Sequence, residues 1–180
     1  MLVIALILIL GAILFPWAKR VGERYLLLRR LKRVCRLKRY AVKTINPFAT
    51  YFRNYSEPCS FTVDTGKTLY AVTFWSEAFA NANLIFTANG NVIRRKKMAE
   101  PFSFSGKRSH RVSEKVVTNL KKRKPILAES RKIVPLLLVF SKTTSLFFFE
   151  KGELKKINIG DIVYDMTLVT KETVLAIIDK

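Results

Sequence analysis

The first seventeen residues, Met1 to Trp17, carry no charged side chain, and the chain turns basic from Lys19 onward. At a helical rise of about 1.5 Å per residue, such a run spans roughly 26 Å, slightly less than the roughly 30 Å hydrocarbon core of a bilayer. Trp17 suits the headgroup level, and cations beside a span favour the cytoplasmic side. The pattern predicts a single-pass anchor over residues 1–17, with the N-terminus outside the cell membrane and the remainder in the cytoplasm.

Two alternatives fit this run less well. A cleaved signal peptide has a basic segment before its apolar run and small residues at its cleavage site. Here only the amino terminus precedes the run, and Phe15-Pro16-Trp17-Ala18 ends it. A buried core helix is the second alternative, although dense positive charge is an unusual continuation for one.

Residues 18–43 follow a helical pattern in which Glu23 is the only acid. A helix is expected over Ala18–Tyr40, with apolar residues recurring at spacings of three and four and with bases opposite them. The apolar positions are Val21, Tyr25, Leu28, Leu31 and Cys35. This juxtamembrane helix can lie in the headgroup plane, with its bases on anionic lipid, or dock its apolar side on the protein's own sheet. Both readings stay open at this stage.

Beyond this helix the hydrophobic period changes to two, as in strands. Turn residues between such runs predict three hairpins. Their strands are Phe61–Asp64 with Thr68–Trp75, Leu84–Ala88 with Asn91–Arg95, and Leu146–Phe149 with Leu154–Ile159. A single globular domain of α/β or α+β class is therefore expected over residues 44–180, built on a small mixed sheet of hairpins.

Three further elements complete the predicted domain. Ile133–Phe140 is expected to form a buried strand, in which Pro135 favours the start of the strand or an edge. A basic helix capped by Ser109 or Ser113 is expected before Pro125, and Thr170 is expected to cap a closing helix over Lys171–Asp179.

The chain has 33 Lys and Arg against 13 Asp and Glu, a formal net charge of +20. Acidic partners are therefore expected, either anionic lipid headgroups or nucleic acid. The charge is concentrated in two blocks. The candidate lipid- or polyanion-binding residues are Lys19, Arg20, Arg24, Arg29, Arg30, Arg33, Arg36, Lys38, Arg39, Arg94, Arg95, Lys96, Lys97, Lys121, Lys122, Arg123 and Lys124.

The residues that usually carry catalysis or bind metals are sparse. Cys35, Cys59 and the lone His110 are too few and too scattered for a zinc site. The sequence predicts no cofactor, no metal and no catalytic set.

The segment Ser60-Phe61-Thr62-Val63-Asp64-Thr65-Gly66-Lys67-Thr68-Leu69-Tyr70-Ala71-Val72-Thr73 resembles two strands of restriction-endonuclease-like domains, including the nuclease-related domains behind bacterial membrane anchors. The resemblance implies an Asp on one strand and a Glu-x-Lys on the next, which bind magnesium and position water. At those positions this chain has the neutral residues Ser60, Ala71 and Thr73. The chain also resembles single-span basic membrane proteins of Gram-positive bacteria, a resemblance that brings no activity with it.

The leading hypothesis is a membrane-anchored, non-enzymatic cytoplasmic domain that associates with an anionic lipid surface or with another membrane protein. The alternative is a membrane-tethered nucleic-acid-binding protein with a degenerate nuclease-like domain. A divergent nuclease using Asp64 and Glu77 is a third hypothesis.

Overall fold

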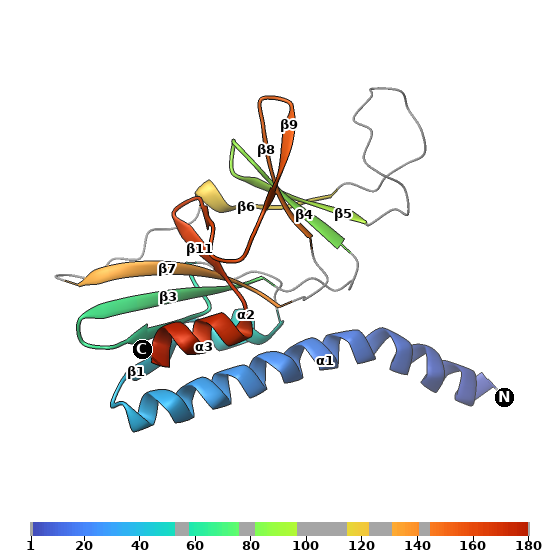
Figure 1. Ribbon diagram of the computed structural model, residues 1–180. Helices are drawn as coiled ribbons and strands as arrows, with labels where there is room; N and C mark the ends of the chain where they lie inside the picture. Colours follow the sequence, from blue (N-terminus) through green and yellow to red (C-terminus); the bar gives the residue numbers. More distant parts are fainter. Residues whose placement is uncertain are drawn as a thin grey trace.

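The computed structural model describes residues 2–52, 58–75, 82–96, 115–122, 131–140 and 145–179. Within these residues the chain has a mixed α/β fold with three α-helices and two mixed sheets. The helices cover one face of the larger sheet, and the smaller sheet lies on its other side (Figure 1). The protein is therefore built in three layers.

The three helices are α1 (Leu2–Leu37), α2 (Pro47–Phe52) and α3 (Lys171–Asp179). The predicted anchor and the predicted juxtamembrane helix thus form one continuous helix, which ends at Leu37 and not at Tyr40. The dark-blue N-terminal part of α1 extends beyond the sheet and bends (Figure 1). Pro16 lies in this part, and a proline inside a helix removes one backbone hydrogen bond and permits a bend.

Among the described residues, no helix is both long enough and apolar enough to cross a membrane. The transmembrane anchor over residues 1–17 stays a prediction from the sequence.

The larger sheet has the strand order β1-β2-β3-β7-β11-β10. Strands β3, β7 and β11 run parallel, and the other neighbours are antiparallel. The strands are β1 (Ala41–Thr44), β2 (Phe61–Asp64), β3 (Thr68–Trp75), β7 (Lys132–Val139), β10 (Ile162–Val163) and β11 (Met166–Val169).

The smaller sheet has the order β6-β5-β4-β8-β9, with β4 and β8 parallel. Its strands are β4 (Ala82–Thr87), β5 (Asn91–Lys96), β6 (Lys115–Asn119), β8 (Ser145–Glu150) and β9 (Glu153–Ile157). The three predicted hairpins are confirmed as β2–β3, β4–β5 and β8–β9.

Strand β7 separates two hydrophobic clusters. Leu136 and Leu138 belong to the cluster beneath the helices, whereas Leu137 and Val139 belong to the cluster between the two sheets. Because successive side chains of a strand point to opposite faces, a strand buried on both faces reads as a continuous apolar run. The position of Pro135 follows the expectation for proline, since β11 pairs with β7 only from Leu136 onward and β7 has only β3 beside it at Pro135.

The predicted basic helix before Pro125 is wrong in its described part. Lys115–Asn119 forms strand β6, and Leu120–Lys122 forms one short 3₁₀ turn. Pairing of β6 with β5 overrides the helical spacing of the segment. Ser109, Ser113 and Pro125 lie outside the described residues. Helix α2 was not predicted.

Candidate lipid- and anion-binding surface on helix α1

Helix α1 is part of the hydrophobic core from residue 24 onward. Leu27, Leu28, Leu31 and Cys35 are buried against the larger sheet. Of the two readings left open by the sequence, the structure shows docking of the apolar side on the protein's own sheet. The opposite side of α1 is consequently fixed in its orientation and faces outward.

Arg24 differs from the other predicted cations because its side chain is fully buried, with 0% exposure. Its Nη1 donates a hydrogen bond of 2.6 Å to the carbonyl oxygen of Thr50 in α2. The guanidinium carbon lies 5.4 Å from the ring centre of Phe74 and 5.8 Å from that of Phe140. Burial, helped by the positive charge of Arg20, lowers the pKa of Arg24 to about 10. Arg24 is therefore a structural cation between α1, α2 and the sheet, and in this structure it is not available to lipid or to a polyanion.

The outward side of α1 carries large apolar residues at an interval of eleven. Phe15, Leu26 and Leu37 are 69%, 62% and 81% exposed. Eleven residues are close to three full helical turns, so these side chains lie along one line of the helix. The eleven-residue interval can be read from the sequence. It belongs to the side of α1 opposite the buried apolar residues, and those buried residues dominate the helical pattern.

Cations lie within this apolar line and beside it. Among the predicted basic residues of α1, the exposed ones are Lys19, Arg29, Arg30, Arg33 and Arg36. Arg20 and Lys38 are half-buried. The Lys38 ammonium lies 3.1 Å from a carboxylate oxygen of Asp179, which joins the C-terminal ends of α1 and α3. Lys38 therefore has its partner within the fold.

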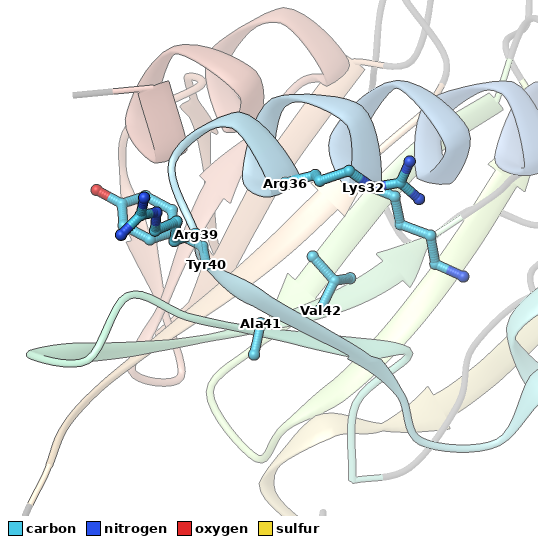
Figure 2. Close-up of a pocket in the computed structure, with 6 residues that line it drawn as sticks. All are labelled: Lys32, Arg36, Arg39, Tyr40, Ala41 and Val42. Carbon is cyan, nitrogen blue, oxygen red and sulfur yellow. The ribbon is translucent and has the colours of Figure 1, made fainter.

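A groove of about 400 Å³ lies between the last turns of α1 and strand β1. Figure 2 shows Lys32 and Arg36 projecting from α1, and Arg39 and Tyr40 at the turn that leads into the strand. Ala41 and Val42 complete the lining. Lys32 and Tyr40 were not among the predicted site residues. Lys32 precedes Arg36 by one helical turn, and this spacing is the signal that indicates their common side.

The second basic block is less uniformly exposed. Arg94 and Arg95 are half-buried on β5, whereas Lys121 and Lys122 are exposed. The Lys121 ammonium donates a 2.6 Å hydrogen bond to the Ala88 carbonyl and lies 5.9 Å from the ring centre of Tyr164. Lys96 ends β5, and Lys97, Arg123 and Lys124 lie outside the described residues. Nucleic-acid binding by this block stays a prediction.

The positions that resemble a nuclease site are inside the protein. Ser60, Ala71 and Thr73 are buried. The Ser60 hydroxyl accepts a 2.9 Å hydrogen bond from the Phe74 amide, and the Ser60 carbonyl accepts one of 2.8 Å from the Thr50 hydroxyl. No cluster of three or more His, Cys, Asp or Glu side chains that could hold a metal occurs in the described part of the chain. Glu77 lies outside it.

Comparison of the chain with models of protein families, with curated proteins and with solved structures found no match. The functional argument therefore rests on the surface of α1.

Proposed function

We propose that this chain is a non-enzymatic domain that binds the anionic, cytoplasmic surface of the cell membrane through helix α1. The observation that carries the proposal is the outward line of Phe15, Leu26 and Leu37 with cations beside it. A helix with apolar residues between long cations is suited to the plane between headgroups and acyl chains. The apolar residues enter the boundary, and the cations extend to the lipid phosphates.

The uncharged residues 1–17 supply the apolar attachment in this proposal. If α1 stood upright from the membrane, Arg33 would lie about 24 Å from Trp17 along the helix at 1.5 Å per residue. That separation exceeds the Debye length of about 8 Å at physiological ionic strength. Arg29, Arg30 and Arg33 therefore contribute only if α1 lies along the surface after residue 17.

Partition of the full chain from neutral detergent into preformed vesicles tests the proposal. Each cation near an anionic surface contributes about 1 kcal/mol. The triple variant Arg29→Gln, Arg30→Gln and Arg33→Gln should therefore lose on the order of a hundredfold of its preference for anionic over neutral vesicles. Glutamine preserves helix propensity, so the helix itself is not perturbed.

The charge-matched control is the triple variant Lys122→Gln, Lys155→Gln and Lys156→Gln, which removes three exposed cations outside α1. This control should keep most of the wild-type preference. Equal loss in both triple variants would show that only net charge matters, and equal partition of wild type into neutral and anionic vesicles would refute the proposal.

A further inference from the structure

We infer that the groove between the end of α1 and strand β1 is a binding site for a phosphate-bearing anion. The groove is lined by Lys32, Arg36, Arg39 and Tyr40, with Ala41 and Val42 beside them. This inference does not depend on the membrane-surface proposal, because the groove lies at the flank of α1 next to β1 and not on the outward line of apolar residues.

The lining has the chemistry that a phosphate group requires. Three of the six lining residues are cations, one carries a phenolic hydroxyl, and none is acidic. Guanidinium groups can donate two parallel hydrogen bonds to phosphate oxygens, and an ammonium adds a point charge. Lys38, next to Arg39 in the chain, is paired with Asp179. A volume of about 400 Å³ is ample for a phosphate or a pyrophosphate group.

The backbone conformation of Arg39 gives the site a sharp test. The Arg39 amide donates to the Arg36 carbonyl at 3.2 Å, and the Tyr40 amide donates to the Cys35 carbonyl at 2.8 Å. This bond pattern is a Schellman motif, and it places Arg39 in the left-handed region with φ of 59°. Glycine is the usual residue at this position because any Cβ carries a conformational cost there.

The helix end does not by itself require an arginine at this position. A cation near the last carbonyls of a helix is favourable, but Arg36 already lies in the last turn. Arg39 therefore occupies a position where glycine would be more stable, with its side chain lining the groove. Arg39→Gly therefore removes a lining cation and relieves the conformational cost in a single substitution.

Calorimetric titration of the full chain in neutral detergent with inorganic pyrophosphate tests the site. Arg39→Gly should weaken pyrophosphate binding about tenfold, the value of one charge-assisted contact, while raising the thermal midpoint by about 2 °C. Arg39→Gln should weaken binding to a similar extent without raising the midpoint, because glutamine keeps the left-handed cost. If Arg39 had only a structural role, Arg39→Gly would not both raise the thermal midpoint and lower the affinity for pyrophosphate.

Two controls separate the effects. Lys151 is exposed in the β8–β9 turn with φ of 52°, so Lys151→Gly should raise the midpoint and leave the affinity unchanged. Arg30→Gln removes an exposed cation of α1 that does not line the groove, and should change the affinity less than twofold. An affinity for pyrophosphate that is the same in wild type and in Arg39→Gly would overturn the inference, as would an equal loss in Arg30→Gln.

A second arm uses glycerophosphoglycerol, a soluble phosphodiester headgroup, in place of pyrophosphate. Binding of both compounds, each weakened by Arg39→Gly, supports a site that accepts lipid headgroups. Binding of pyrophosphate alone supports a site for a free phosphate compound. Absence of binding of either compound overturns the inference, and because this assay contains no vesicles, that outcome leaves the membrane-surface proposal unaffected.

Discussion

The buried guanidinium of Arg24 gives the fold an unusual dependence on alkaline pH. Burial lowers its pKa from the usual guanidinium value to about 10. At 1.36 kcal/mol per pH unit, this lowering of the pKa means that burial destabilises the charged form of Arg24 in the folded state by roughly 3 kcal/mol. The hydrogen bond to Thr50 and the rings of Phe74 and Phe140 offset part of that cost. The variant that exposes this balance is Arg24→Met, which fills the site without a charge.

The sign of the pH effect follows from proton counts. Above pH 10 the folded protein loses the Arg24 proton while the unfolded chain still keeps it, so the unfolded state binds more protons and stability rises with pH. The free energy of unfolding of wild type should therefore rise relative to that of Arg24→Met by about 2 kcal/mol between pH 9 and pH 11.5. At neutral pH the two proteins should differ by only about 1 kcal/mol, because loss of the buried charge compensates for the lost contacts.

Urea unfolding at a series of pH values measures this difference, with the fluorescence of the buried Trp75 as the signal. Other titrating groups occur in both proteins and cancel in the comparison. Arg30→Met, which removes an exposed guanidinium, controls for the loss of one positive charge. A difference between wild type and Arg24→Met that does not change with pH would refute the reasoning.

Three further outcomes are expected. Burial raises the pKa of Tyr164 to about 12, so the contribution of Tyr164 to stability is complete below pH 10 and is lost as the pH rises through 12. Tyr164→Phe should remove an ionisation step near pH 12 from the ultraviolet titration, and an unchanged amplitude of that step would contradict this. The Thr170 hydroxyl accepts a 3.2 Å hydrogen bond from the Thr173 amide, so Thr170→Ala should lower the free energy of unfolding by about 1 kcal/mol in urea titrations, and no loss would show that the cap contributes nothing. Cys35 and Cys59 are buried, and burial raises the pKa of the Cys35 thiol. Neither thiol should therefore react with a thiol reagent until the protein unfolds, and rapid reaction of the native protein would contradict their placement.

Local patterns in the sequence determined much of the fold. Asn89-Gly90 is the turn pair between the two predicted strands of the β4–β5 hairpin. In the structure Gly90 adopts φ of +92°, and a Cβ there would come within 2.6 Å of the Asn119 amide oxygen. Thr170 likewise predicted the start of α3. These elements depend on contacts between residues close in the chain, and turn and cap chemistry records such contacts directly.

The errors arose where distant contacts decide the structure. Strand β6 has a helical spacing of apolar residues, yet it pairs with β5 more than twenty positions earlier in the chain. Arg24 was assigned to the basic side of α1, although it precedes the buried Leu28, Leu31 and Cys35 by four, seven and eleven residues. That spacing places it on the core side. Its charge concealed the pattern, because buried arginines are rare and depend on partners such as Thr50 that no local rule predicts.

The depth of α1 in a bilayer tests the central claim most directly. Single cysteines at positions 26, 37 and 162 replace exposed residues, and the native cysteines are buried, so each new thiol can be labelled selectively with an environment-sensitive fluorophore. On anionic vesicles, lipid-borne quenchers should reach the labels at 26 and 37 equally and should not reach the label at 162. An upright α1 would place position 37 about 16 Å further from the bilayer than position 26. Quenching at 26 without quenching at 37 would contradict the account.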